Sequence, residues 1–303
     1  MLTRYVERDL TWIDLIAPTP QEVRSLMAEF DIDPVFAEEL LTPSFKPKAE
    51  RRGEHLYLVL HFPVLRGMHQ RAEAEIDFLL GRNFLITARY GESDRLHAFS
   101  KAFEVHSVLR PSAPLGHGGH LFAAMARNLY HALRAECDAV NRRLEHIEEH
   151  IFSGDERQMV IEISQTARVI HDFRQALLPH AEMLQTLEPL SSRLFGQDFA
   201  FYLRGVMGEE ARVRGAVEHL REALHELRET NNSLLNTKQN EIMKTLTMMA
   251  FVTFPLTLIA TVFSMDTRST PIVGAPGDFW IVIGIMGALA LGFFIYFVRK
   301  GWL

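Results

Sequence analysis

The chain has 303 residues, a net charge of -6 and a single cysteine. This charge supplies no basic field for nucleic acid, and one cysteine excludes an internal disulfide and any CxxC metal or redox motif. The mean hydropathy of +0.00 averages two unlike parts, since residues 1–240 are highly charged and the sequence from Thr245 onward is mostly apolar. The first residues are charged and contain no signal peptide, which predicts a cytoplasmic N-terminus.

Residues 1–115 are interpreted as a cytoplasmic α/β domain, because predicted strands and short helices mix there. Thr19, followed by Pro20 and Glu22, is a typical helix start. Apolar segments at 55–62, 75–80 and 83–88 predict three strands. Gly81-Arg82, between the last two segments, predicts a hairpin turn.

Residues 116–200 are predicted to form a cytoplasmic helical hairpin. Apolar residues recur every three or four positions from Leu121 to Ile151, and Gly154 ends this pattern. A second stripe runs from Ile163 to Leu177 and ends near Pro179. Cys137 belongs to the first stripe and is interpreted as a small buried side chain.

The next region is predicted to be one unusually long helix. No Gly or Pro occurs from Ala216 to Phe254, so a single helix is expected over residues 201–263. At 1.5 Å per residue this helix would be roughly 90 Å long. Such a length suits a stalk that leaves the cytoplasm and enters a bilayer.

Two uncharged runs predict membrane spans at about 245–265 and at 279–298. Each has about 20 residues, enough for a hydrocarbon core of about 30 Å. Lysines precede the first span, and the short tail 299–303 after the second is basic. The positive-inside rule therefore predicts that both termini are cytoplasmic and that the loop 264–278 lies outside.

One face of the first span carries hydroxyl groups at helical spacing, at Thr247, Thr257, Thr261 and Ser264. A cation path needs oxygen ligands or held water, but such hydroxyls also bond to the preceding turn of their own helix. Both interpretations stay open at this point. Two helices cannot enclose a pore, so a pore along this face requires several copies of the chain. Phe254 would then form an apolar ring, as a gate or as packing.

Several segments resemble the CorA family of divalent metal cation transporters, which includes the zinc transporter ZntB. WIDL at 12–15 followed by Pro18-Thr19, KPKAE at 46–50 and NFLIT at 83–87 resemble segments of the family's N-terminal domain. NEIMKTLT at 240–247 and PLTLIA at 255–260 resemble its membrane-proximal segments. By the number, order and spacing of these segments, the chain is identified as a member.

The resemblance implies an α+β cytoplasmic domain with long stalk helices and two transmembrane α-helices per chain. It implies a funnel-shaped homopentamer in the bacterial inner (plasma) membrane, with no tightly bound cofactor. The expected partners are further copies of the chain, the lipid bilayer and transported divalent cations (Mg²⁺, with Zn²⁺, Co²⁺ or Ni²⁺ as further candidates), and no nucleic acid. Asn240, Leu246, Phe254 and Thr257 match positions along the family's pore, and the hydroxyl face adds Thr247 and Thr261.

Two places depart from the family pattern. The family's Gly-Met-Asn signature at the outer mouth is replaced by Ser264-Met265-Asp266. A ring of Asp266 carboxylates would bind cations more tightly and less selectively than amides, and like charges would raise some of their pKa values. Gly205 stands where some members carry a regulatory aspartate, and the nearby Glu209 and Glu210 are the candidates for a regulatory metal site.

The remaining motifs indicate no enzyme, since there is no Walker loop and no nucleophile–base signature. His146 and His150 have a spacing that can bind a transition metal, but they are interpreted as part of a solvated helix face. His117 and His120 are interpreted as loop residues. Two alternatives to selective divalent transport stay open: a poorly selective cation channel, and a non-conducting sensor or scaffold that retains the fold.

Overall fold

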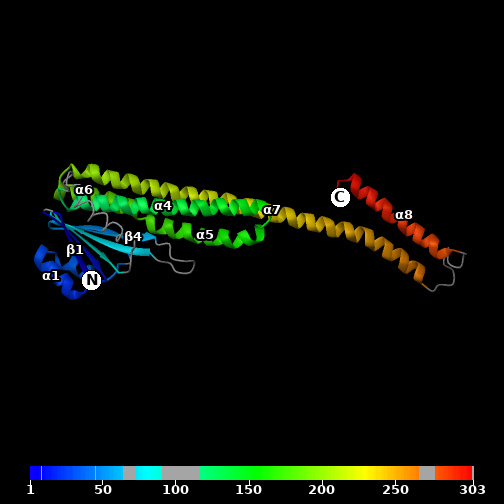
Figure 1. Cartoon of the computed structure of the whole chain (residues 1–303), viewed down its shortest axis with the longest axis horizontal. Coiled ribbons are helices and arrows are strands. Elements are labelled where there is room, and N and C mark those ends of the chain that lie inside the picture. Colours follow the sequence, from blue (N-terminus) through cyan, green and yellow to red (C-terminus); the bar gives the residue numbers. More distant parts are fainter. Residues whose placement is uncertain (8, 45, 64–72, 91–115, 266–276, 302–303) are drawn as a thin grey trace. The chain divides into compact units, whose positions relative to one another are not determined.

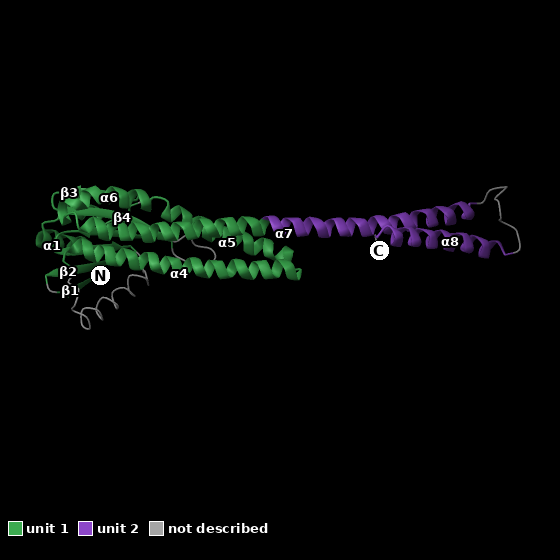
Figure 2. Cartoon of the chain, turned by 90° about the horizontal axis from the view of Figure 1, so that it is seen from above, with its two compact units in different colours: residues 1–228 green, residues 229–303 purple. Residues whose placement is uncertain are grey.

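The structure is a computed structural model that describes residues 1–7, 9–44, 46–63, 73–90, 116–265 and 277–301. The chain divides into two compact units, residues 1–228 and residues 229–303, which Figure 2 shows in different colours.

A six-stranded sheet lies at the centre of the first unit (Figure 1). Its strands are in the order β1-β2-β6-β5-β4-β3. Neighbouring strands are antiparallel except β2 and β6, which are parallel. The predicted strands are confirmed as β4, β5 and β6, and the predicted hairpin joins the last two, with the Gly81 N–H 3.0 Å from the Phe84 carbonyl. The strands are β1 (Leu2–Glu7), β2 (Leu10–Ile16), β3 (Lys48–Arg52), β4 (His55–Pro63), β5 (Glu73–Leu80) and β6 (Phe84–Arg89).

Helices α1 (Pro20–Phe30) and α2 (Pro34–Glu39) cover one face of this sheet. Thr19 caps α1 as predicted: its hydroxyl accepts the Glu22 N–H at 3.3 Å, and the Glu22 carboxylate accepts the Thr19 N–H at 2.9 Å. Apolar side chains of both helices pack on alternate residues of the strands, and burial of each contributes about 1.5–3 kcal/mol. The residues of this core, from both the strands and the helices, include Ile13, Leu15, Val23, Leu26, Phe36, Leu40, Tyr57, Val59, Leu79 and Ile86.

The opposite face is covered by α4 (Gly118–Ser153), α5 (Glu156–Leu177) and α6 (His180–Phe195). Phe78 of β5 packs edge-on against Phe122, with ring centroids 5.2 Å apart. Gly154 ends α4 with a left-handed φ of 107°, as its position in the sequence predicts. The expected hairpin is three helices instead of two: α6 was missed because Pro179 and Pro189, which read as helix breakers, lie at its N-cap and inside it.

Helix α7 (Phe199–Ser264) is a single helix of 66 residues, as the sequence predicts to within a few residues at each end. Its residues up to 228 belong to the first unit and the rest to the second. Helix α8 (Asp278–Arg299) follows in the second unit. Among the described residues, α7 and α8 are the helices long and apolar enough to cross a bilayer, and the apolar side chains of these segments are largely exposed in the single chain.

Candidate ion pathway

The six predicted pathway residues lie in the second unit, on one side of α7. At about 100° per residue, all six fall within a sector of about 120° around the helix axis. Leu246 is 56% exposed and Phe254 is 72% exposed in the single chain. Large apolar side chains this exposed need lipid or other protein surfaces around them. The six residues are Asn240, Leu246, Thr247, Phe254, Thr257 and Thr261.

Every hydroxyl on this side of α7 bonds back to the helix. Thr247 donates to the Met243 carbonyl at 2.7 Å, Thr257 to Thr253 at 2.9 Å and Thr261 to Thr257 at 2.8 Å. The back-bonding that the sequence left open is therefore present. It uses only the hydroxyl proton, so each oxygen keeps lone pairs that can still accept. These oxygens are acceptors of the kind that a cation or its hydration shell requires.

Pro255 interrupts the backbone hydrogen bonds of α7 beside Phe254. The helix continues through Pro255, whose nitrogen carries no hydrogen. The carbonyl of Phe251, four residues earlier, therefore loses its usual helix donor. The Phe251 carbonyl therefore adds a backbone oxygen acceptor to the hydroxyl acceptors near Phe254.

Basic groups gather where α7 and α8 come together at one end of the two apolar segments. The Lys244 ammonium donates to the Gly301 carbonyl at 3.4 Å, so α7 contacts the end of α8. The Lys300 ammonium lies 5.7 Å from the centre of the Tyr296 ring and 3.4 Å from its hydroxyl. This pairing of cations with a tyrosine is typical of the boundary between a membrane and water.

The predicted outer-mouth signature is only partly described. Ser264 is the last residue of α7, and its hydroxyl donates to the Thr261 carbonyl at 2.8 Å. Met265 follows with 56% of its surface exposed. Asp266, the hypothesised metal ligand, lies outside the described residues.

Glu209 and Glu210, the candidates for a regulatory metal site, are buried and paired with arginines. Glu209 accepts a hydrogen bond from Arg212 at 2.6 Å, and Glu210 accepts one from Arg214 at 3.0 Å. Burial raises the pKa of Glu210, and Arg214 opposes this shift. A metal ion at either carboxylate would compete with its arginine.

The histidine pairs supply two ligands each at most. The His146 and His150 rings lie 4.0 Å apart on α4. Across the described ranges, no group of three or more His, Cys, Asp or Glu side chains is placed to hold a metal ion. The loop interpretation is wrong for His120, which lies in the first turn of α4, while His117 is its N-cap. Their rings stack 3.9 Å apart, and burial lowers the pKa of His117 to about 4.

Together, the sheet-based N-terminal unit, the long helix with an acceptor-lined apolar segment and the second apolar helix define a two-span membrane protein with a candidate ion pathway. The family model for CorA-like Mg2+ transporter protein matches residues 7–300, and the chain belongs to this family. The resemblance seen in the sequence is confirmed. As a member of a family of membrane transporters, the chain is a transport protein and not an enzyme.

Relatives of established name match nearly the whole chain. The "Cobalt/magnesium transport protein CorA" of Thermotoga maritima is 23% identical over 97% of this chain and 83% of its own length. The "Putative metal ion transporter YfjQ" of Bacillus subtilis is 23% identical over 96% of this chain and 89% of its own length. The solved CorA magnesium transporter of Methanocaldococcus jannaschii is 19% identical, with a TM-score of 0.83 over 99% of this chain and 93% of that chain. This structural match shows that the fold is shared.

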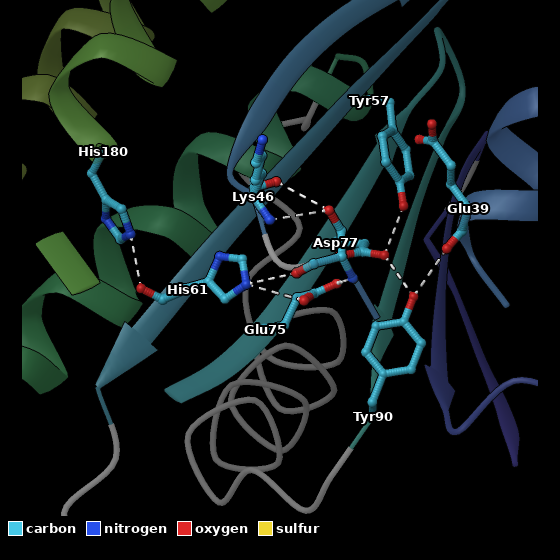
Figure 3. Close-up of polar contacts among 9 residues, drawn as sticks. Glu39, Lys46, Tyr57, His61, Glu75, Asp77, Tyr90 and His180 are labelled. Atoms are coloured by element: carbon cyan, nitrogen blue, oxygen red, sulfur yellow. Dashed lines mark hydrogen bonds and ion pairs between the residues drawn. The ribbon is translucent and has the colours of Figure 1, made fainter. Parts of the chain in front are cut away.

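The sequence interpretation missed a buried group of acidic and tyrosine side chains in the first unit. Asp77 is 0% exposed, and Tyr57 and Tyr90 donate to it (Figure 3). A signal was present, because Glu75 and Asp77 occupy alternate positions of β5 among mostly apolar residues and so face the same side of the sheet. The tyrosine partners of Asp77 come from β4 and from the residue after β6, and they could not be paired with it from the sequence.

Proposed function

We propose that five copies of the chain surround a central pore lined by α7, and that this pore carries divalent metal cations, with Mg²⁺ as the principal cargo. The observation that supports this most directly is the exposed side of α7, which combines hydroxyl acceptors with unpacked Leu246 and Phe254. The names of the Thermotoga maritima "Cobalt/magnesium transport protein CorA" and of the Methanocaldococcus jannaschii CorA magnesium transporter support the choice of cargo.

The pore would work by alternating apolar and polar rings. Leu246 and Phe254 would form two apolar constrictions that exclude water and close the path when they narrow. Thr247, Thr257 and Thr261 would offer oxygen lone pairs to a hydrated cation between and beyond these constrictions. Asn240 would add amide oxygens at the cytoplasmic approach. Mg²⁺ loses its water reluctantly, which suits a path that holds the hydrated ion.

The outer mouth would carry a ring of Asp266 carboxylates beside Ser264 and Met265. Negative charge there raises the local concentration of cations, while repulsion between like charges keeps some of the carboxyls protonated. The replacement of the family's Gly-Met-Asn by this sequence favours a second candidate, a pore that discriminates poorly between cations. Zn²⁺, Co²⁺ and Ni²⁺ are further candidate cargoes for the same reason.

The direction of transport follows from the orientation proposed for the spans. With both termini in the cytoplasm of a bacterial inner membrane, Lys244 and Lys300 lie at the cytoplasmic boundary. A membrane potential that is negative inside favours entry of a divalent ion by about 5 kcal/mol per 100 mV. Passive conduction inward therefore needs no nucleotide.

Flux measurements on the full chain in liposomes test the proposal. Uptake of Mg²⁺, Zn²⁺, Co²⁺ and K⁺ would be compared in the wild type, in Asp266→Ala and in Phe254→Ala. Phe263→Ala is the matched control, because nine residues at about 100° each bring Phe263 to the opposite side of α7. We expect divalent uptake that Phe254→Ala increases and Phe263→Ala leaves unchanged.

Each alternative has its own outcome. Absence of flux for every ion would leave only a non-conducting sensor or scaffold. Equal fluxes of K⁺ and the divalent ions would establish the poorly selective channel. Flux unchanged in Asp266→Ala would remove the role assigned to that carboxylate. The oligomer is tested separately by light scattering in detergent, where a protein mass other than five times 34.7 kDa would contradict the pentamer.

A further inference from the structure

A buried carboxylate with two tyrosine partners lies between the sheet and α2. Asp77 on β5 is opposite Val59 on β4 and 0% exposed. Its Oδ2 accepts hydrogen bonds from the Tyr57 hydroxyl at 2.7 Å and the Tyr90 hydroxyl at 2.8 Å. The Tyr90 hydroxyl also lies 3.2 Å from the carbonyl oxygen of Glu39, the last residue of α2 (Figure 3). Tyr90 thus stands between a titratable carboxyl and the end of a helix.

The number of available protons decides whether the Tyr90 hydroxyl donates to Asp77 or to the Glu39 carbonyl. Each tyrosine hydroxyl has one proton to donate. An ionised Asp77 has no proton, so it accepts hydrogen bonds from both Tyr57 and Tyr90. Tyr90 then has no hydrogen to donate to the Glu39 carbonyl. When a protonated Asp77 carries its proton on Oδ2, it donates this proton to the Tyr90 oxygen. Tyr90 then turns its proton to the Glu39 carbonyl, and the end of α2 gains a hydrogen bond to the sheet.

The groups around Asp77 favour uptake of this proton near neutrality. Burial raises the pKa of Asp77 to about 7, and the charge of Glu75 and a side-chain hydrogen bond with Glu75 act in the same direction. The hydrogen bonds from Tyr57 and Tyr90 oppose this shift. Glu75 also accepts the Ser44 N–H at 2.6 Å and lies 3.0 Å from His61 Nε2. From the side of α2, the Glu39 carboxylate pairs with the Lys48 ammonium.

The histidines near the cluster have different roles. His61 Nε2 lies 2.9 Å from the Ser44 carbonyl, which can only accept, so this nitrogen carries a hydrogen. His180 of α6 lies 3.0 Å from the His61 carbonyl and 2.9 Å from the Tyr130 hydroxyl. Burial lowers the pKa of His180 to about 4, so His180 stays neutral over the range in which Asp77 titrates. Asp77 is therefore the group of this cluster whose pKa is raised toward neutrality, and Glu75 and His61 lie beside it.

We propose that Asp77 is a proton-operated switch that fastens the C-terminal end of α2 to the sheet when it is protonated and releases it when it is ionised. The output is the direction of one hydrogen bond at Tyr90. The switch is independent of the proposed pore, because every group in it belongs to the first unit. It makes the packing of α2 on the sheet sensitive to the pH around the N-terminal unit.

Hydrogen–deuterium exchange of the full chain in detergent tests the switch. Exchange of a peptide covering residues 34–42 would be measured at about pH 5.5 and about pH 8.5 and corrected for the intrinsic pH dependence of exchange. One added hydrogen bond predicts roughly fivefold slower exchange at the lower pH. A peptide covering β4 reports whether each variant keeps the fold of the sheet.

Three variants separate the titration of Asp77 from the hydrogen bond that Tyr90 donates to Glu39. Asp77→Asn supplies a neutral donor and should give slow exchange of α2 at both pH values. Tyr90→Phe removes the hydroxyl that bonds to Glu39 and should give fast exchange of α2 at both pH values. Tyr57→Phe is the matched control: it removes the other tyrosine proton from the same oxygen, so it should retain the pH dependence and move its midpoint upward. The proposal is overturned if the wild-type peptide exchanges equally at both pH values, or if Tyr90→Phe retains the wild-type difference.

Discussion

Replacement of Gly118 by alanine probes how tightly α4 is attached to the sheet. Gly118 is the first residue of α4, and its N–H donates to the Arg82 carbonyl at 3.0 Å. A Cβ at this position would lie 2.2 Å from the Phe84 carbonyl oxygen and 2.4 Å from the Gly81 carbonyl oxygen. Both are backbone atoms of the β5–β6 hairpin, so no side-chain rotation relieves the overlap, and the helix start has to move away.

The expected loss of stability is at the upper end of what overpacking produces, about 3 kcal/mol. For a unit of 228 residues this corresponds to a decrease in Tm of about 6–12 °C. Gly215→Ala on α7 is the matched control, because a Cβ there meets nothing within 4 Å. Alanine has the higher helix propensity by up to about 1 kcal/mol, so Gly215→Ala should raise Tm by about 2–4 °C.

Circular dichroism of the full chain in detergent, at one scan rate for all variants, measures these shifts. A common scan rate is needed because unfolding of a membrane protein is commonly irreversible. If Gly118→Ala unfolded at the wild-type temperature, or if both variants shifted in the same direction, the contact between α4 and the hairpin would not be the constraint described.

Three further predictions concern charge and the pathway. Because the pKa of Asp77 is raised on folding, its contribution to stability is complete at acid pH and is lost as the pH rises through about 7; the unfolding midpoint of the wild type should fall over that range, and that of Asp77→Asn should not. Asp14→Ala should lower the unfolding free energy by about 3–5 kcal/mol, measured by chemical denaturation, because it removes the carboxylate 2.7 Å from the buried Arg89 guanidinium; Asp9→Ala, which changes an exposed carboxylate of the same type, should stay near the wild type. Phe254→Ala should increase Mg²⁺ flux into liposomes, and a flux equal to that of Phe263→Ala would contradict the gate.

Most local elements could be predicted from the sequence because their causes are local. The cap at Thr19, the hairpin at Gly81 and the helix end at Gly154 each depend on residues within a few positions of one another. The two apolar segments were equally predictable, because length and lack of charge are properties of a continuous stretch. Helix α6 was not predicted because proline is usually taken as a helix breaker, whereas Pro189 is accommodated inside a helix that packs on the sheet.

The candidate pathway shows what helical spacing can and cannot predict. Helical spacing was enough to group Thr247, Phe254, Thr257 and Thr261 on one side of α7. It could not show whether the hydroxyls bond to their own backbone, which depends on side-chain rotamers. It also could not show that Glu209 and Glu210 are buried, because their burial depends on how α7 packs in the first unit. Their arginine partners lie only three and four residues further along the same helix, within the reach of helical spacing.

The sequence by itself determined the long helices other than α6, three of the strands with one hairpin, the two membrane-length segments and the family resemblance. Each of these rests on periodicity, composition or short motifs within a continuous stretch of chain. Only the tertiary structure decided the parallel pairing of β2 with β6 and the meeting of Glu39, Asp77 and Tyr90. These groups are far apart in the sequence, and they come together only because the strand order and the helix packing bring separate segments to one place on the sheet.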